Sequence, residues 1–316
     1  MSNYILKRFL SIIPVLIIVA IIVFSITFIT PGDPATYILG PDASPDNIEK
    51  LREEMGLNQP FFQQFFAWIG SMFQGDLGMS VFLNKPVLDV VISYLSPTIL
   101  LALLSEAIAI IIALILGVVA SVKRNTVVDQ GVMGFALLGL STPSFLLGLL
   151  LVLVFSVQLN WFPTSGYMPL SEGLLNHLRY LILPAISLGF IQAALITRIT
   201  RSSMLDVLPL EYIKTAKAKG LSRKSVIFKH ALRNAFIPIL EVIGQSLTTL
   251  LAGAAVIEIV FNIPGIGQLL VNSIERRDFP VIQGTVLIIA GGYVFMNLII
   301  DLLYGIFDPR VRINRK

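Results

Sequence analysis

Hydrophobic residues gather in six long blocks that are separated by polar segments. The blocks are Phe9–Thr30, Pro97–Val122, Val132–Leu159, Leu181–Thr200, Ala235–Val260 and Val281–Ile306. An α-helix needs about 20 residues, at roughly 1.5 Å each, to cross a hydrocarbon core about 30 Å thick. Each block reaches that length. The pattern therefore predicts an all-α, polytopic membrane protein with six transmembrane helices.

Composition supports the same class. Only 13% of the 316 residues are charged, whereas an average soluble domain has about 25%. The first block follows Lys7 and Arg8, as the apolar part of a signal peptide would, but it is longer than the usual stretch of about 7–15 residues. The segment after it, Thr30–Pro34, has no small-residue cleavage pattern. We interpret the first block as a retained transmembrane helix.

The distribution of basic residues predicts the orientation in the membrane. Lys and Arg concentrate at the cytoplasmic ends of transmembrane helices. With both termini in the cytoplasm, most of the 23 basic residues lie inside, and the outer segments keep only Lys50, Arg52, Lys85, Arg179, Arg276 and Arg277. We therefore expect cytoplasmic N- and C-termini. The net charge of +4 follows from this bias and does not indicate nucleic-acid binding.

The outer segment between the first two blocks has its own pattern. Asn47–Met55 is a predicted polar helix that ends at Gly56, and Phe61–Gln74 is a predicted helix with a wide aromatic stripe. The second helix is too short to span a bilayer, so it lies in the interface or packs on the bundle. The predicted organisation is a tail and first helix (1–30), an extracytoplasmic cap (31–96), a five-helix core (97–307) with a cytoplasmic loop (201–234), and a cytoplasmic tail (308–316).

A basic amphipathic stretch, Glu211–Leu240, separates the fourth and fifth blocks. Its Lys and Arg residues recur at helical intervals, and Gly220 interrupts it after a predicted short helix, Tyr212–Lys219. A loop that only reconnected two helices would be shorter. Two interpretations are open: a docking surface for a cytoplasmic partner, or a helix lying on anionic lipid, where each basic residue contributes about 1 kcal/mol.

Several catalytic and cofactor motifs are absent from the sequence. No G-x-x-x-x-G-K-[ST] phosphate loop occurs, so the chain cannot bind ATP by that device, and there is no H-E-x-x-H metal motif. The two histidines, His177 and His230, fall on opposite sides of the membrane in the predicted topology. With no cysteine either, we expect no metal site, no cofactor in this chain and no enzymatic activity of its own.

Four acidic residues lie in or near the blocks: Glu106, Glu241, Glu258 and Asp301. A charge at the centre of a transmembrane helix costs about 2.5–3.5 kcal/mol on insertion scales. These residues either line a polar pathway, or pair across helices and reach out from helix ends. The sequence leaves both interpretations open.

Ten short strings, in order along almost the whole chain, resemble the permease subunits of the dipeptide/oligopeptide/nickel family of bacterial ATP-binding-cassette (ABC) importers. They are PGDP at 31–34, GDLG at 75–78, STPSF at 141–145, LPAISLG at 183–189, RITRSSMLDVL at 198–208, YIKTAKAKGLS at 212–222, HALRNAFIP at 230–238, VIEIVFNIPGIG at 256–267, RRDFPVIQG at 276–284 and DLLYGIFDPR at 301–310. The 212–222 string corresponds to the importers' cytoplasmic loop signature, E-A-A followed by three residues and Gly. Lys214-Thr215-Ala216 stands in place of E-A-A, and Gly220 is the Gly.

The resemblance implies a type I ABC importer permease fold in a bacterial inner membrane. It implies a pore shared with a second permease, two cytoplasmic ATP-binding subunits that hold ATP and Mg, and an extracytoplasmic substrate-binding protein. The implied ATPase-docking coupling helix comprises Tyr212, Lys214, Thr215, Ala216, Lys217, Ala218, Lys219, Gly220 and Leu221. The candidate residues of the translocation pathway or gate are Glu106, Ser141, Pro143, Glu258, Asn262, Pro264 and Gly265.

The implied cargo is a short peptide, with glutathione, a nickel–chelator complex and an oligosaccharide as alternatives. A different class of transporter is an ion-coupled secondary transporter that works alone. Such proteins usually contain internal repeats, and the six blocks show no convincing repeat. The sequence therefore favours an ATP-driven importer subunit over a secondary transporter.

Overall fold

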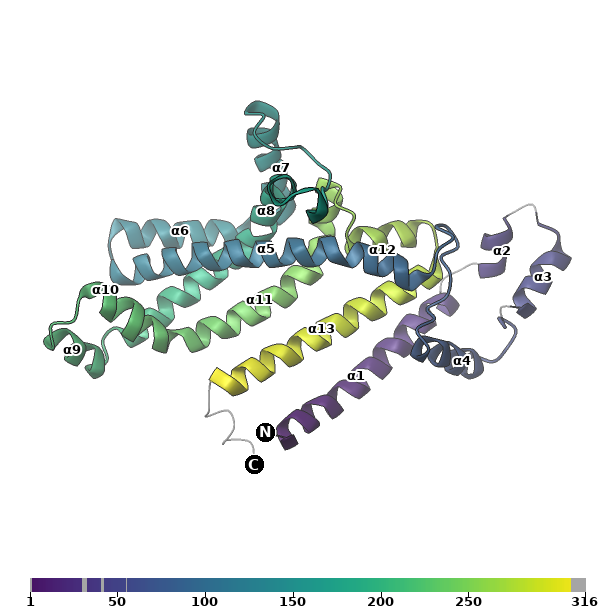
Figure 1. The fold of residues 1–316 in the computed structure, drawn as a ribbon, viewed down its shortest axis with the longest axis horizontal. Coiled ribbons are helices and arrows are strands. Elements are labelled where there is room, and N and C mark those ends of the chain that lie inside the picture. Colours follow the sequence, from purple (N-terminus) through teal and green to yellow (C-terminus); the bar gives the residue numbers. More distant parts are fainter. Residues whose placement is uncertain (1, 30–32, 41–42, 55, 308–316) are drawn as a thin grey trace. The chain divides into compact units, whose positions relative to one another are not determined.

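The computed structural model describes residues 2–29, 33–40, 43–54 and 56–307 (Figure 1). The tail predicted at 308–316 and parts of the strings at 31–34 and 301–310 lie outside these residues. The helices are α1 Ser2–Ile29, α2 Pro34–Leu39, α3 Pro45–Glu54, α4 Phe61–Phe73, α5 Val87–Val122, α6 Val127–Ser141, α7 Ser144–Leu151, α8 Leu174–Val207, α9 Glu211–Ala218, α10 Arg223–Ser225, α11 Leu232–Phe261, α12 Ile266–Glu275 and α13 Phe279–Phe307. Two π-helical segments, η1 (Val152–Gln158) and η3 (Val226–Ala231), continue α7 and precede α11, and η2 (Leu170–Glu172) is a 3₁₀ turn.

The all-α membrane fold is confirmed. Within the described ranges, five helical segments are long and apolar enough to cross a membrane: Ile12–Ile29, Val87–Val122, Leu174–Val207, Arg223–Phe261 and Phe279–Ile300. A sixth span is reached if the bent pair Val127–Ser141 and Ser144–Gln158 counts as one. Several helices, such as α5 and α8, begin well before the hydrophobic blocks that predict them. Hydrophobicity marks the membrane-length part of a helix and not its ends.

The third block is the one that does not form a single straight helix. The chain bends by 105° between α6 and the segment Ser144–Gln158. Pro143 has no N–H to donate, and its ring disfavours a helical backbone in the residue before it. Thr142 accordingly has an extended backbone (φ −94°, ψ 120°), and α6 ends at Ser141. The expected continuous helix over Val132–Leu159 is therefore wrong, and STPSF marks the break.

The structure divides into two compact units, each with its own packing. Unit 1 comprises 1–96 and 265–295, and unit 2 comprises 97–264 and 296–316. In unit 1, α4 packs on α1 through aromatic rings. The Phe24 ring centroid lies 5.3–5.4 Å from those of Phe61, Phe65 and Trp68. The predicted aromatic helix is confirmed, and it packs on the bundle. The polar helix before it is also confirmed as α3.

A second contact in unit 1 fixes the loop between α4 and α5. The buried carboxylate of Asp278 accepts hydrogen bonds from the Ser80 hydroxyl (2.5 Å) and the Phe82 backbone N–H (3.3 Å). The Arg276 guanidinium stacks over the Phe82 ring, 3.7 Å from its centroid. Because a buried carboxylate needs such donors, this contact holds the start of α5 near the start of α13.

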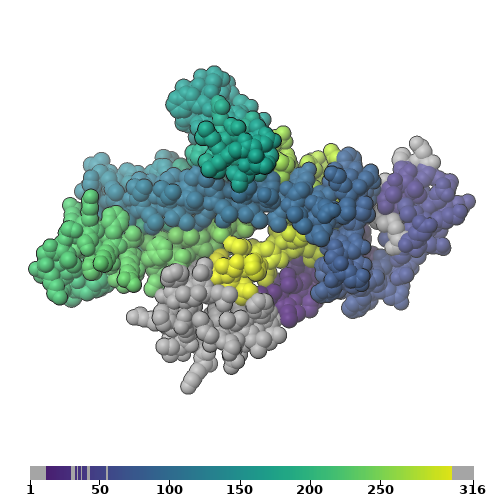
Figure 2. All heavy atoms as spheres, viewed as in Figure 1, coloured from purple at the N-terminus to yellow at the C-terminus, as the bar shows by residue number. Residues whose placement is uncertain are grey.

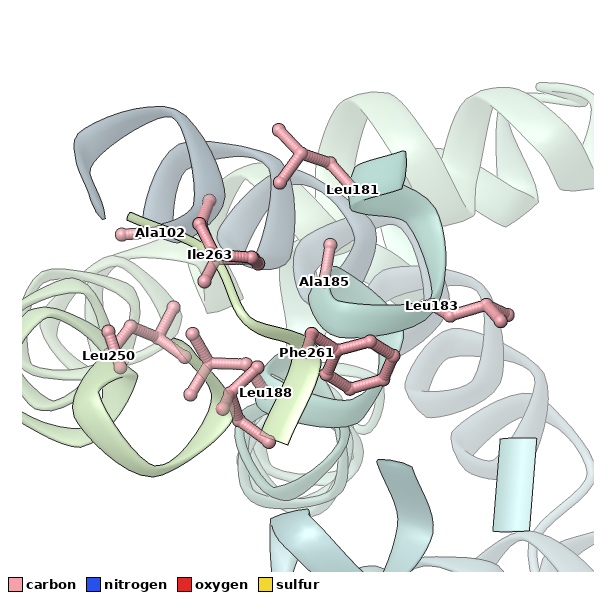
Figure 3. Close-up of a cluster of buried hydrophobic side chains, with 11 residues drawn as sticks. Ala102, Leu181, Leu183, Ala185, Leu188, Leu250, Phe261 and Ile263 are labelled. Carbon is pink, nitrogen blue, oxygen red and sulfur yellow. The ribbon is translucent and has the colours of Figure 1, made fainter. Parts of the chain in front are cut away.

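In unit 2, α8 is the central helix and packs against α6, α7 and α11. One buried cluster includes Leu188, Leu250, Ile257, Phe261 and Ile263 (Figure 3). A second cluster, further along α8, includes Ile196, Met204, Ile213 and Ile239. In a bilayer, where lipid tails are as apolar as these side chains, close van der Waals packing between the helices supplies the attraction.

Glycine permits the closest approach in unit 2. A Cβ atom at Gly189 of α8 would lie 2.5 Å from the backbone oxygen of Ser105 in α5. One at Gly117 of α5 would lie 2.5 Å from the Thr200 Cβ of α8. Real Cβ atoms do not approach other atoms so closely. These two positions therefore require glycine for the observed distance between α5 and α8.

Candidate functional site

The segment between α8 and α11 carries the predicted docking surface. The chain leaves α8 at Val207, turns through Pro209 and forms α9 (Glu211–Ala218), one residue earlier at each end than the predicted Tyr212–Lys219. Glu211 in the first turn and Lys217 in the last suit the helix dipole. The predicted short helix is confirmed.

Gly220 ends α9 in a left-handed conformation, with φ +77°. The Gly220 N–H donates to the Lys217 carbonyl (3.0 Å), and the Leu221 N–H donates to the Ala216 carbonyl (3.3 Å). These two bonds form a Schellman motif, which satisfies the last helical carbonyls and needs a residue with positive φ at this position. Ser222 then caps α10, where its hydroxyl accepts a bond from the Ser225 N–H (3.3 Å).

The two faces of α9 differ. Ile213 and Ala216 are buried and pack against unit 2 residues that include Val118, Met204 and Val226. The other predicted docking residues are exposed: Tyr212, Lys214, Thr215, Lys217, Ala218, Lys219, Gly220 and Leu221. Ala216 therefore holds α9 onto its own unit, and the exposed face is the one available to a partner.

A cleft of about 400 Å³ lies beside α9. Its lining residues come from the end of α5, the residue after α8 and the segment that follows α9, together with Lys217 of α9 itself: Ser121, Val122, Leu208, Lys217, Leu221, Arg223, Val226 and Ile227. Figure 2 shows the corresponding green segment next to the end of α5. In the part of the chain that the structure describes, neither Lys217 nor Arg223 forms an ion pair. The surface around α9 is thus a basic face with a cleft that is lined by both basic and apolar side chains.

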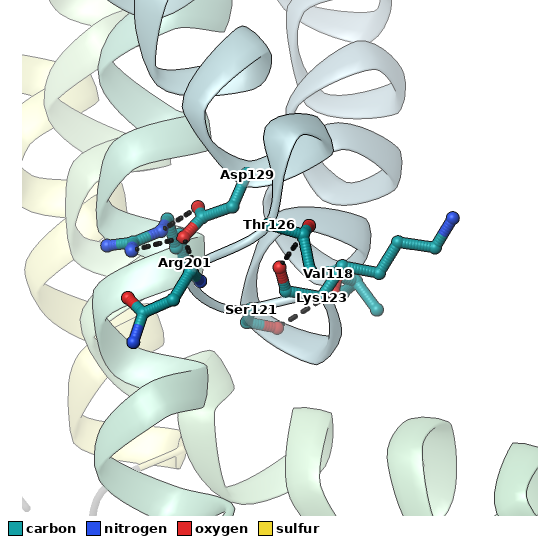
Figure 4. Close-up of polar contacts among 7 residues, drawn as sticks. Val118, Ser121, Lys123, Thr126, Asp129 and Arg201 are labelled. Atoms are coloured by element: carbon teal, nitrogen blue, oxygen red, sulfur yellow. Dashed lines mark hydrogen bonds and ion pairs between the residues drawn. The ribbon is translucent and has the colours of Figure 1, made fainter.

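A partly buried ion pair lies at the same end of unit 2. The Asp129 carboxylate of α6 accepts from the Nε (2.5 Å) and Nη2 (2.8 Å) atoms of Arg201 in α8 (Figure 4). It also accepts from the Asn125 N–H (2.9 Å), in a turn where Asn125 has φ 61°. The bidentate geometry is that of a strong arginine–carboxylate pair. It joins the α5–α6 turn to the helix that leads into α9.

Sequence reasoning missed this pair as a site. Arg201 counted only toward the charge bias, and Asp129 lies three residues before the predicted start of the third block. The two residues are 72 positions apart. The sequence feature that could have predicted this ion pair is an acidic and a basic residue, each at the polar end of an apolar block, on the same predicted side of the membrane.

The candidate pathway residue Glu106 of α5 is 6% exposed. One carboxylate oxygen accepts a hydrogen bond from the Ser246 hydroxyl of α11 (2.5 Å), and the other has no hydrogen-bond partner. Glu106 borders a cavity of about 130 Å³ whose other lining residues are mostly apolar: Leu240, Ile243, Gly244, Leu247, Met296, Ile299 and Ile300. The structure therefore shows a hydrogen bond between α5 and α11, and a second Glu106 oxygen that has no hydrogen-bond partner.

Glu258, the second acidic candidate, is fully buried near the end of α11 and accepts a bond from the Thr98 hydroxyl of α5 (2.5 Å). Glu106 and Glu258 thus both join α5 to α11, which favours the interpretation of pairing across helices. The side chain of Asp301 lies outside the described side chains.

The other candidates lie at two breaks in the helices. Ser141 and Pro143 are exposed at the 105° bend after α6. Asn262 ends α11 with a left-handed backbone (φ 51°) and is exposed. Pro264 is half-buried and Gly265 is buried. No group of three or more His, Cys, Asp or Glu that could hold a metal ion occurs among the described residues.

Membrane-length helices, a short basic helix outside them and polar pairs between them define a class: a multi-pass membrane protein. Two family models extend this result. Residues 109–313 match the binding-protein-dependent transport system inner membrane component, and residues 1–115 match the N-terminal region of such components. The chain belongs to the family of binding-protein-dependent transport system inner membrane components, and it is an inner-membrane protein.

Full-length relatives are similar to this chain. A peptide transport system permease protein of Brucella abortus is 47% identical over 312 residues, which is 99% of each chain. The glutathione transport system permease protein GsiC of Escherichia coli is 43% identical over 312 residues, again 99% of each. A crystal structure of an amino acid ABC transporter with histidines matches over 70% of this chain and 94% of its own, at 17% identity and a TM-score of 0.49.

Proposed function

We propose that the chain is one permease subunit of an ATP-driven importer of short peptides. The observation that carries the proposal is similarity over 99% of the chain to a peptide transport system permease and to a glutathione transport system permease. Glutathione is itself a small peptide, so the two relatives share a cargo chemistry. Glutathione is the second candidate cargo.

The proposed complex contains this chain and several partner subunits. A second permease completes the pathway, two cytoplasmic ATP-binding subunits supply the energy, and an extracytoplasmic binding protein delivers the cargo. The absence of a phosphate loop from the sequence supports an external source of ATP hydrolysis. In alternating access, the permease exchanges between an inward-open and an outward-open state. A ligand shifts this equilibrium only if it binds one state more tightly than the other, and ATP binding would favour the outward-open state.

The α9 helix is the proposed contact with an ATP-binding subunit. Its exposed face carries Tyr212, Thr215 and Lys219, and its buried face is anchored by Ile213 and Ala216. Because α9 is anchored in this way, a force on its outer face would reach the ends of α5 and α8. Glu106, Ser141, Pro143, Glu258, Asn262, Pro264 and Gly265 remain the candidate pathway or gate residues.

Reconstitution tests this proposal. The purified chain alone is expected to show no ATP hydrolysis above background. Expressed with its operon partners, it is expected to co-purify with a second permease and two ATP-binding subunits, and the complex with its binding protein should take up labelled di- or tripeptides only with ATP. Uptake by this chain alone under a proton or sodium gradient would identify a secondary transporter instead. Unlabelled glutathione is added as a competitor of the labelled peptides. Strong inhibition of uptake favours glutathione as the cargo, and weak inhibition favours other short peptides.

A further inference from the structure

The exposed face of α11 is polar in the middle of the helix, which is unusual for a helix of membrane length. Glu241, Gln245 and Thr249 follow one another at four-residue intervals and are all exposed. Residues four apart lie on the same side of an α-helix. The three side chains therefore form one polar stripe, roughly 12 Å long at 1.5 Å per residue.

The exposed face of α5 provides the comparison. Ile99, Leu103, Ala107, Ile111, Ile115 and Val119 are the exposed residues at four-residue intervals along this helix. All of them are apolar, as expected of a face that contacts lipid tails. The two helices belong to the same bundle and have similar lengths, 36 and 30 residues. Only one of the two exposed faces has the chemistry of a lipid-facing surface.

The polar groups of the stripe have unused hydrogen-bonding capacity. Within the described residues, no hydrogen bond or ion pair involves the Glu241 carboxylate or the Gln245 side-chain amide. The Thr249 hydroxyl donates to the Gln245 backbone carbonyl (3.0 Å) and keeps its lone pairs. Ser246, about 100° round the helix from Gln245, is buried and donates to Glu106. A carboxylate in contact with hydrocarbon is costly, so this face needs water, a cation or polar groups.

We propose that Glu241, Gln245 and Thr249 form a binding stripe for the backbone of a peptide in the translocation pathway. This proposal rests on the proposed function. The α-ammonium group of a peptide would be the positively charged partner of the Glu241 carboxylate. The Gln245 amide and the Thr249 hydroxyl can form hydrogen bonds with peptide N–H and C=O groups. The stripe matches an extended peptide of about three or four residues, at roughly 3.4 Å each. Contacts to the backbone suit cargo with variable side chains.

Water accessibility provides the first test. The chain has no cysteine, so Gln245→Cys and Ile111→Cys each introduce a single thiol. Gln245 lies roughly 20 Å from the start of α11, and Ile111 roughly 16 Å from the end of α5, on the same side of the predicted topology. Both variants are studied in the complete complex in proteoliposomes. A charged methanethiosulfonate reagent should modify Gln245→Cys at least about tenfold faster than Ile111→Cys. The mass of this subunit reports the modification, and excess dialanine should slow it.

Peptide uptake provides the second test. Glu241→Gln keeps the size of the side chain but removes its charge. Uptake of a dipeptide with a free amino group should fall about tenfold, the loss expected when a charge-assisted hydrogen bond becomes a neutral one. Uptake of the N-acetylated dipeptide should change much less. Binding-protein-stimulated ATP hydrolysis and subunit composition should be retained.

Three outcomes would overturn the binding stripe. They are equal reactivity of Gln245→Cys and Ile111→Cys, equal effects of Glu241→Gln on free and acetylated dipeptides, and loss of the second permease from the Glu241→Gln complex. The last would show a subunit interface. A complex that assembles and imports peptides but gives one of these results refutes the stripe alone. A complex that imports no peptide refutes the proposed function first.

Discussion

At the scale of single residues, the direction of the chain after α9 depends on Gly220. Its φ of +77° is costly for a residue with a Cβ atom, and most of all for a β-branched one. No atom lies within 4 Å of a Cβ built there, so the cost comes from the backbone alone. We expect Gly220→Val to abolish transport and detach or uncouple the ATP-binding subunits, while membrane insertion stays near normal. Uptake, ATP hydrolysis and co-purification measure these effects.

The matched control is Gly220→Asn, because asparagine tolerates the left-handed region better than other residues with side chains. This variant should retain most of the transport activity. Normal transport and normal co-purification in Gly220→Val would contradict the docking role of α9. The basic stretch would then be interpreted as a helix on the membrane surface.

A second residue-scale prediction concerns Gly189, where α8 approaches the backbone of α5. An alanine Cβ would lie 2.5 Å from the Ser105 oxygen, so the two helices must move apart. We expect Gly189→Ala to destabilise the protein by about 1–3 kcal/mol, the usual cost of overpacking. Thermal unfolding in detergent measures the change. Gly131→Ala in α6, where no atom lies within 4 Å, is the control and should be neutral or slightly stabilising.

The roles of these two glycines differ in how well the sequence predicts them. Gly220 was predictable, because a glycine after a short basic helix is the usual terminator and the signal is local. Gly189 was not, because its role depends on Ser105 in another helix. The orientation of Ala216 was also beyond the sequence: a small residue in a docking string suits either face of α9, and packing against unit 2 decides the matter.

At the scale of elements, Asp129 and Arg201 tie the start of α6 to the end of α8. Asp129 left alone would be a poorly solvated charge, since its side chain is only 4% exposed, and Arg201 at 23% exposed would be partly desolvated. We expect Asp129→Asn and Arg201→Gln each to cost roughly 2 kcal/mol, in the range for hydrogen bonds to charged groups. The double variant should cost clearly less than the sum of the two. Unfolding midpoints of the four proteins give the coupling, and strict additivity would contradict a direct interaction.

The predicted helices agree with the structure where a local sequence pattern marks their ends. They disagree where a helix ends inside a continuous hydrophobic block. The aromatic period predicts α4 almost to its ends, Phe61–Phe73. The third block is apolar on both sides of Thr142–Pro143, so hydrophobicity alone joins α6 to α7. Prolines also lie inside α5, α8 and α11, at Pro97, Pro184 and Pro238. A proline therefore shows where a bend is permitted, and tertiary packing determines whether it occurs.

At the scale of the whole molecule, length and hydrophobicity are sufficient for the class, because the bilayer sets a fixed helix length. They say little about pathway residues. Glu106 and Glu258 were candidates because acids are rare in such helices, and both hydrogen-bond across to a neighbouring helix. The exposed stripe of Glu241, Gln245 and Thr249 becomes visible only when the exposed face of α11 is known.

The predicted orientation in the membrane rests on the distribution of basic residues. The segment from Arg198 to Arg233 is rich in Lys and Arg, and moving it to the outer face would violate the bias that fixes membrane topology. We expect Ser222→Cys, at the start of α10, to be protected from an impermeant thiol reagent in whole cells. Ser44→Cys, just before α3, should react. Both sites precede helices and the chain has no other thiol, so permeabilised cells, in which both must react, control for accessibility. The opposite labelling pattern in intact cells would place α9 outside and remove it from contact with any cytoplasmic ATP-binding subunit.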